Sequence, residues 1–432
     1  MKIDKSERDR IVKLVKEQVV PAIGCTEPIC VALCVAKATE TLGEKPESVH
    51  VFLSANILKN AMGVGIPGTG GMVGLPIAVA LGALIGKSSY QLEVLKDVTR
   101  EDVECGKAYI AERRIKIELK ENITEKLYVE VKVTGNNGNE AVAVIAGNHT
   151  HFVYVEHKGE VLLDERHASS GDKQEESYDL NLRKVYDFAM EAPLEEIEFI
   201  REARTLNEAA SAQALKGCYG HELGKTLSRP LGRGILGDTM FSHILSSTSC
   251  ACDARMAGAM IPVMSNSGSG NQGICATMPV VIFAEENHNT DEELIRALML
   301  SHLTAIYIKQ SLGVLSALCG CVVASTGSSC GITYLMGGGY EQISYAVKNM
   351  IANLTGMICD GAKPSCALKL TSGVSTAVLS AMLAMQQKCV SSVEGIIDDD
   401  VDRSIHNLTS IGADAMNETD KMVLNIMTHK SC

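Results

Sequence analysis

Three long stretches without a charged residue place the strongest constraint on how this chain of 432 residues can fold. They cover residues 60–86, 256–284 and 310–340, and each is long enough to cross a bilayer as a helix. They are nevertheless rich in Gly, Ser, Thr, Asn and Pro, particularly at residues 67–71 and 265–272. Such residues would leave backbone polar groups unpaired in lipid. We therefore expect no membrane span, but a buried, solvent-poor interior around an active site.

The composition is that of a globular protein with enough residues for two domains, 46% of them hydrophobic and 21% charged. A net charge of −12 argues against nucleic acid or an anionic membrane as partner, because both are bound by a basic face. The 15 cysteines are odd in number and irregularly spaced, and the N-terminus is polar, with Lys2, Asp4 and Lys5. These features predict reduced thiols and a cytoplasmic location. A homodimer is compatible with the sequence.

Hydrophobic periodicity separates helical from strand-forming segments. Apolar residues at helical spacing predict two N-terminal helices, at residues 7–20 and about 27–41. Alternating segments separated by turn signals predict strands at 49–54, 115–120, 127–133, 141–145 and 152–157. Later segments are predicted to be helical at 180–189, 194–215, 291–312, 343–353, 374–385 and 401–419.

These elements predict an α+β fold with a mainly α-helical domain and a smaller α/β domain inserted after the N-terminal helices. We expect residues 1–46 to be helices that pack with the helical domain. Residues 47–175 would form the α/β domain, ending in a polar linker at 164–177. Residues 176–432 would form the all-α domain.

Five cysteines lie close together in the C-terminal part of the sequence: Cys319, Cys321, Cys330, Cys359 and Cys366. Cys359 and Cys366 bracket a loop with a glycine and a proline, which can direct two thiolates to one point. Zinc sites favour C-x2-C pairs, which this chain lacks, whereas iron–sulfur clusters accept more varied spacing and need three or four thiolates. Spacing alone leaves metal binding and structural burial as alternatives.

Cys25 is a candidate reactive thiol. Thr26 is suited to cap a helix that has Glu27 and Pro28 in its first turn, which would place Cys25 at the helix N-terminus. The helix dipole there stabilises a thiolate, so we expect a lowered pKa and a role as general base or nucleophile. The alternative is a buried cysteine that only packs.

Two glycine-rich loops carry polar side chains suited to binding an anion. In residues 265–273, backbone N–H groups and the side chains of Ser267, Ser269 and Asn271 can form a cradle for a carboxylate or phosphate. Residues 65–74 form a similar loop that contains Thr69 and follows Asn60. Nearby, Arg255 can pair with a ligand carboxylate or with Asp253. Plain connecting loops are the alternative.

Three histidines are weaker candidates. His149 and His151 stand at i and i+2 of an expected strand, where they would share one face. That spacing is compatible with metal binding and also with simple exposure to solvent. His302 lies in an expected helix, where a hydrogen-bonded core histidine is the commoner role.

Four motifs follow one another along the chain: Gly-Cys-Thr-Glu-Pro at 24–28, Ser-Asn-Ser-Gly-Ser-Gly-Asn-Gln-Gly at 265–273, Ser-Ala-Leu-Cys at 316–319, and Gly-Met-Ile-Cys-Asp-Gly-Ala at 356–362 with Cys366. Together they resemble the L-cysteine desulfidase family, which is related to the α subunit of iron–sulfur L-serine dehydratases. The resemblance runs from about residue 20 to residue 427.

This resemblance implies an oxygen-sensitive lyase that holds one [4Fe–4S] cluster in its helical domain and uses no pyridoxal phosphate. Its substrate would be L-cysteine, converted to pyruvate, ammonia and sulfide without net redox change. By motif match, the cluster ligands would be Cys319, Cys359 and Cys366, which leaves one iron open, and Cys25 would be the base. The substrate would be bound by Asn60, Thr69, Arg255, Ser267, Ser269 and Asn271.

Two cysteines leave choices open. Cys321 follows a glycine, as the first ligand of iron–sulfur serine dehydratases does, so it competes with Cys319, which has the desulfidase-like context. In some serine dehydratases a C-terminal cysteine occupies the open iron; Cys432 could have that role here, but a disordered chain end is the favoured alternative.

Three other functions fit the sequence. The same fold and cluster would also suit elimination of water from L-serine. A pyridoxal-phosphate lyase would use residues 267–273 as a phosphate cup and Lys363 as the Schiff base. A non-catalytic protein with a structural zinc site is the third.

Overall fold

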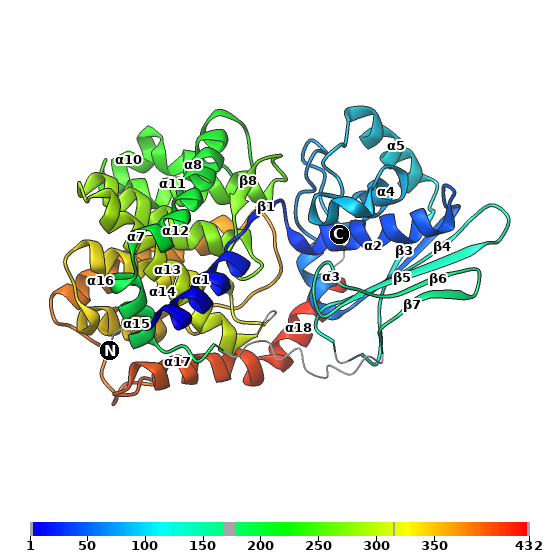
Figure 1. Ribbon diagram of the computed structural model, residues 1–432. Helices are drawn as coiled ribbons and strands as arrows, with labels where there is room; N and C mark the ends of the chain where they lie inside the picture. The colour runs from blue at the N-terminus through cyan, green and yellow to red at the C-terminus, as the bar shows by residue number, and fades with distance from the viewer. Residues whose placement is uncertain (1–2, 124, 167–177, 314–315, 430–432) are drawn as a thin grey trace.

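The computed structural model describes residues 3–123, 125–166, 178–313 and 316–429 (Figure 1). These residues form an α+β fold in which a helical body lies beside a sheet covered by helices. The expected linker at 164–177 falls mostly outside the described residues, and Cys432 lies outside them as well.

Within the described chain, six strands form one mixed sheet in the order β3-β2-β4-β5-β6-β7. β2 pairs in parallel with β3, and the other pairs are antiparallel. Val49, Val51 and Leu53 of β2 are buried while the residues between them are not, as in a sheet with one covered face. The strands are β2 (Ser48–Leu53), β3 (Ile115–Leu119), β4 (Tyr128–Thr134), β5 (Glu140–Ala146), β6 (Phe152–His157) and β7 (Glu160–Asp164).

Helices α2 (Thr26–Leu42), α4 (Leu75–Leu84) and α5 (Arg100–Ala111) cover the sheet. α2 packs on β4 and β5, α4 on α2, and α5 on α4. This differs from the expectation that residues 1–46 pack with the helical domain, since α2 contributes its apolar side chains to the core of the sheet. α2 is buried on nearly all sides, so it needs the neighbours that the sheet and α4 supply. Two short elements, α3 (Ala55–Ala61) and the 3-10 helix η1 (Ser88–Glu93), complete this part.

The helical body has its own hydrophobic core, in which α14 (Gly320–Leu335) packs against α12, α13, α15 and α16. α14 is rich in Gly and Ser, and these small residues allow close approach. A Cβ on Gly327 would lie 2.2 Å from the backbone oxygen of Ser301 in α13. The other helices are α1 (Lys5–Gln18), α6 (Leu182–Glu191), α7 (Leu194–Ile197), η2 (Glu198–Ile200), α8 (Arg201–Lys216), α9 (Leu223–Ser228), α10 (Pro230–Leu236), α11 (Met240–Met256), α12 (Gly270–Glu286), α13 (Asp291–Leu312), α15 (Tyr340–Leu354), α16 (Cys366–Met385), α17 (Val401–Ser410), η3 (Ile411–Ala415) and α18 (Asn417–Thr428).

Contacts between remote segments of the chain join the helical body to the sheet part. β1 (Pro21–Ile23) pairs antiparallel with β8 (Pro262–Met264), which comes directly before the loop at 265–269. At the other end of the chain, α18 contacts α3 through Asp420, which accepts hydrogen bonds from Lys59 and Asn56. Figure 1 shows α18 (red) reaching from the helical body toward α3.

α16 is the one described helix that is long and apolar enough to cross a membrane by length and composition. Half of its apolar segment is buried inside the protein, where α16 packs against α11, α14 and α15. The three uncharged stretches instead contain α4, α12 and α14 together with loops.

Candidate functional site

Cys25 lies where the two parts of the protein meet. After β1, Gly24 adopts a φ of +69° and turns the chain, so that Cys25 becomes the N-cap residue of α2. Thr26, the expected cap, is the first residue of the helix instead. The Cys25 thiol donates a hydrogen bond to Oε2 of Glu27 across 2.9 Å, and Thr26 Oγ1 donates to the same oxygen across 3.1 Å. The thiol is therefore held on a buried carboxylate.

The electrostatics of Cys25 differ from the sequence-based expectation. A helix N-terminus was expected to lower its pKa. Burial and the adjacent Glu27 carboxylate instead raise the pKa of the Cys25 thiol well above its ordinary value, while Arg255 acts in the opposite direction. Cys25 is thus a neutral thiol, and it becomes a base only when its proton moves, with Glu27 as the nearest acceptor.

The three expected cluster ligands come from two neighbouring loops and a helix start. An antiparallel bridge between residues 318 and 358 brings Cys319 and Cys359 to adjacent chain segments. Cys319 is the N-cap residue of α14, and Cys366 is the first residue of α16. Two of the three thiols therefore stand at the positive end of a helix dipole, although burial still raises the pKa of the Cys366 thiol.

These thiols border a cavity of about 110 Å³, which we call the thiol chamber. Cys25 lies on its wall together with Cys319, Cys359 and Cys366, so the expected base and the expected ligands face one space. Other described residues on this wall are Glu27, Asn60, Arg255, Ser269, Asn271, Gln272, Cys321 and Lys369.

Cys319 and Cys321 both border the thiol chamber, with their sulfurs 3.6 Å apart. The hydrogen bond between the two thiols lowers the pKa of the Cys319 thiol to about 6, against the effect of burial, and Lys369 and Lys363 act in the same direction. The same hydrogen bond raises the pKa of Cys321, whose sulfur also contacts Met357 Sδ at 3.2 Å. The environment thus favours a thiolate on Cys319 and a thiol on Cys321.

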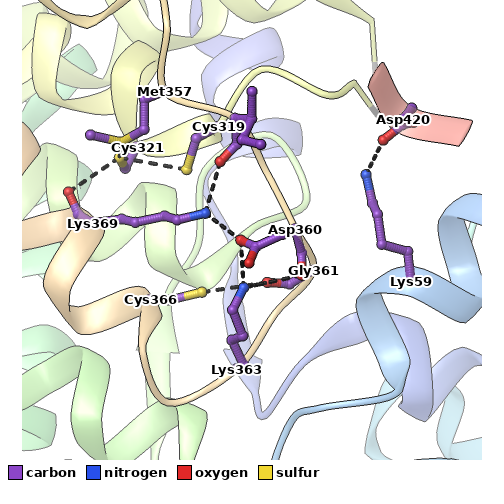
Figure 2. A network of polar contacts seen from close by, with 11 residues as sticks. Lys59, Cys319, Cys321, Met357, Asp360, Gly361, Lys363, Cys366, Lys369 and Asp420 are labelled. Atoms are coloured by element: carbon purple, nitrogen blue, oxygen red, sulfur yellow. Dashed lines mark hydrogen bonds and ion pairs between the residues drawn. The ribbon is translucent and has the colours of Figure 1, made fainter. Parts of the chain in front are cut away.

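Two lysines and an aspartate surround the cysteine loop (Figure 2). The Asp360 carboxylate forms ion pairs with Lys363, at 2.6 Å, and with Lys369. Burial alone would raise the pKa of Asp360, but the hydrogen bonds from these lysines lower it to about 2. Lys363, the Schiff-base candidate, also donates to the backbone oxygens of Asp360 and Gly361 and does not border the thiol chamber. The net positive charge of this group suits several thiolates in one place.

The structure brings most, but not all, of the expected substrate-binding residues together. Asn60, Arg255, Ser269 and Asn271 border the thiol chamber. Oδ1 of Asn60 and Nε of Arg255 are buried without a hydrogen-bond partner among the described residues, as is expected where a polar ligand binds. Thr69 differs, because its hydroxyl donates to Ile66 O across 2.7 Å and closes its own turn. Thr69 borders neither the thiol chamber nor the adjoining cavity described below, so it lies outside the site.

A second cavity of about 110 Å³, here called the second chamber, adjoins the thiol chamber. The two share a wall that includes Glu27, Asn60, Ser269, Gln272 and Cys359. Its remaining described wall includes Ser267, His149, Lys309, Ser316 and Leu318. A larger cavity, of about 640 Å³, lies on the far side of Lys309 and Ser267 and has no cysteine on its described wall.

Glu27, Gln272, Lys309 and Lys369 border these chambers although they were not predicted as site residues, and His149 was considered only as a possible metal ligand. Glu27 stands in the same motif as Cys25, so its position was a usable signal. His149 was expected on a strand, but it lies in the turn between β5 and β6, partly exposed and with its Nε2 buried. Lys309 is only 8% exposed, in a helix whose sequence gives no sign of which face meets the site.

His302 is a hydrogen-bonded core residue, as its place in a helix predicted. Its Nδ1 accepts a hydrogen bond from Nδ2 of Asn266 across 3.1 Å, and its Nε2 lies 3.0 Å from the hydroxyl of Thr277. That hydroxyl already donates to Gly273 O, so Nε2 carries the ring proton and donates to Thr277. The imidazole therefore ties α13 to the glycine-rich loop through Asn266 and to α12 through Thr277.

The residues present fit an iron–sulfur cluster better than a single metal ion. No three His, Cys, Asp or Glu side chains in the described ranges gather closely enough to hold one ion. A cluster bonds each cysteine to a different iron, so its ligands stand apart around a shared space, as Cys319, Cys359 and Cys366 do around the thiol chamber.

Comparison with known proteins places the chain in a family. A family model described as serine dehydratase alpha chain matches residues 89–425. A UPF0597 protein of Bacteroides thetaiotaomicron is 71% identical over 98% of this chain and 99% of its own length. UPF0597 proteins of Porphyromonas gingivalis and Shewanella halifaxensis are 54% and 47% identical, each over at least 97% of both chains. The chain belongs to the serine dehydratase α-chain family and, within it, to the UPF0597 proteins.

Proposed function

We propose that this protein is a carbon–sulfur lyase that converts L-cysteine to pyruvate, ammonia and sulfide by β-elimination. The observation that carries the proposal is the set of residues gathered on the wall of the thiol chamber. The Cys25 thiol shares this wall with Cys319, Cys321, Cys359 and Cys366, and a carboxylate and an arginine line the same wall. The membership in a serine dehydratase family supports the reaction type, because loss of a β-substituent from an α-amino acid is the chemistry that this family name describes.

The elimination begins with removal of the Cα proton, which is weakly acidic and needs a base held close. Glu27 takes the proton of Cys25 along their hydrogen bond, while Arg255 favours the resulting thiolate. The Cys25 thiolate then accepts the Cα proton. The electron pair forms the Cα–Cβ double bond as the Cβ–sulfur bond breaks, and the aminoacrylate product hydrolyses to pyruvate and ammonia.

Cys319, Cys359 and Cys366 would hold the [4Fe–4S] cluster. When bound by three thiolates, the cluster supplies an open, Lewis-acidic iron that stabilises the departing sulfur. Lys363 and Lys369 would offset the negative charge that accumulates beside these cysteines. Asn60, Ser269 and Asn271 would hold the amino acid against this wall.

Elimination of water from L-serine is the second candidate, favoured by the match to the serine dehydratase α-chain model. We place L-cysteine first because soft thiolate ligands suit iron of this kind better than a hydroxyl does. A thiolate is also a better leaving group than hydroxide, since its conjugate acid is more acidic by several pKa units.

The test is to purify the protein anaerobically, measure iron and acid-labile sulfide, and record the absorption spectrum. Sulfide release from L-cysteine is then compared with pyruvate formation from L-serine at equal concentrations. We expect a brown protein that releases sulfide from L-cysteine with the higher kcat/KM. A preference for L-serine would establish the second candidate, and a colourless protein that binds zinc would overturn both.

A further inference from the structure

The second chamber contains two nitrogen atoms that have no partner within the described structure. Nε2 of His149 is buried and makes no hydrogen bond. Nζ of Lys309 is joined to no described residue by a hydrogen bond or ion pair, although the residue is 8% exposed. Burying an ammonium without an anion is costly, so a cavity wall that carries both groups is suited to an anionic ligand.

The shared wall between the chambers carries the complementary atoms. Oδ1 of Asn60 and Oε1 of Gln272 are buried acceptors without a partner, and the Glu27 carboxylate lies beside them. A Cβ on Gly320 would lie 2.9 Å from the Gln272 side chain, so the absence of a side chain at Gly320 leaves room for this amide. These acceptors suit the ammonium group of an α-amino acid.

We propose that the second chamber is the carboxylate subsite of the substrate, in which Lys309 pairs with the α-carboxylate and His149 donates to it. This assignment rests on the proposed function and completes the binding of the amino acid. The ammonium group meets Asn60 and Gln272 at the shared wall, and Cα lies there next to Cys25. The β-thiol points into the thiol chamber.

Arg255 was the sequence-based choice for pairing with the carboxylate, but it is placed to act on the base. It favours the charged form of Cys25, and a Cβ on Gly270 would lie 2.2 Å from its Nε. Of the two chambers, Arg255 borders only the thiol chamber, and Lys309 borders only the second chamber. The two cations therefore have different tasks: Arg255 acts on the Cys25 thiol, and Lys309 acts on the carboxylate of the substrate.

Two small probes separate the carboxylate from the rest of the substrate. 3-Mercaptopropionate has the thiol and the carboxylate, and cysteamine has the thiol and the ammonium group. Binding of each probe to the cluster-loaded protein is measured by anaerobic calorimetry. For Lys309→Met we expect the Kd of 3-mercaptopropionate to rise by about 10- to 100-fold, the effect of losing one charge-assisted hydrogen bond, with cysteamine unchanged. Lys309→Arg should recover part of the affinity.

Matched variants control for charge and folding. Lys126→Met removes an exposed cation that acts electrostatically on Lys309 but borders neither chamber, and it should leave both Kd values unchanged. His149→Gln should weaken 3-mercaptopropionate, whereas His151→Gln, which changes an exposed residue paired with Glu165, should not. Thermal midpoints and iron content show whether each variant is folded and loaded.

In turnover assays, Lys309→Met should raise KM for L-cysteine more than it lowers kcat. An equal loss of both probes, no loss of either, or a selective loss of 3-mercaptopropionate in Arg255→Met instead would overturn the assignment. Wild-type turnover is read separately. A protein that turns over neither amino acid but binds 3-mercaptopropionate through Lys309 would refute the proposed function and leave the anion subsite standing.

Discussion

The thiol of Cys25 donates a hydrogen bond to the carboxylate of Glu27 across 2.9 Å, at the point where the sheet and the helical body meet. Both groups are buried, and the pKa of Glu27 is lowered in spite of burial by His149 and by the hydrogen bond from Cys25. The pair therefore rests as a thiol beside a carboxylate. In the proposed mechanism its proton moves from sulfur to oxygen along this hydrogen bond.

Changing Glu27 to Gln should lower the pKa of the Cys25 thiol, because the Glu27 charge and hydrogen bond both raise it. Alkylation of Cys25 by iodoacetamide can be followed by mass spectrometry across a pH series. At each pH below the thiol pKa, it should be faster in the variant than in the wild type. Turnover should nevertheless fall by about 10²- to 10⁴-fold, since the proton acceptor is lost.

Cys25→Ala should abolish turnover and leave the cluster spectrum intact, which separates a base from a ligand.

If Cys25 in the Glu27→Gln variant were alkylated more slowly than in the wild type, Glu27 would not be the group that holds the thiol neutral.

Cys319 and Cys321 should differ in their effect on the cluster. Replacing Cys319 by Ser should remove most of the iron and the visible absorption, because Cys319 is the thiolate of the pair. Replacing Cys321 by Ala should retain the iron, and it should raise the pKa of Cys319 in the protein without metal, because the hydrogen bond between the two side chains is lost. Iron content and absorption after anaerobic reconstitution decide between them, and the reverse pattern would make Cys321 the ligand.

The ion pair between Lys59 and Asp420 should anchor α18 (Figure 2). Lys59 is 2% exposed, so Asp420→Ala leaves a buried ammonium without its anion and should lower the unfolding free energy by about 3 kcal/mol or more. Hydrogen exchange should rise in α18 and in α3. Glu418→Ala, which removes an exposed pair with Lys421 in the same helix, should cost at most about 0.5 kcal/mol. Equal effects in the two variants would contradict this role.

His302 should make the protein sensitive to acid. Burial lowers its pKa to about 3, from 6.5 in an exposed histidine. The folded state therefore binds fewer protons than the unfolded state between these values, so the stability is present above pH 6.5 and is lost as the pH falls.

Between pH 6.5 and 5.5 this loss amounts to about 1 kcal/mol for one such histidine. His302→Gln should be less stable than the wild type at pH 7, since Asn266 and Thr277 lose a partner, but it should lack this part of the pH dependence. Urea unfolding at the two pH values measures the difference, and parallel losses in both proteins would exclude His302 as the cause.

The local patterns of the sequence were enough to predict the strands and several helices. The predicted helix at 291–312 coincides with α13, and the strand at 152–157 coincides with β6. Alternation and helical periodicity are properties of short segments, so they predict secondary structure without knowledge of the tertiary contacts. α14 was not predicted, because its Gly and Ser residues resemble a loop until the backbone of α13 is packed against them.

The site divides in the same way. The sequence by itself determined the α+β class. Its motifs also singled out four cysteines as site candidates: Cys25, Cys319, Cys359 and Cys366. Only the tertiary structure decided that these thiols share one chamber, that His149 and Lys309 meet in the next, and that Thr69 lies outside both. It also reversed the expected pKa shift of Cys25, because burial and a neighbouring carboxylate outweigh the helix dipole. Such effects depend on distances between segments remote in sequence, and no local pattern encodes those distances.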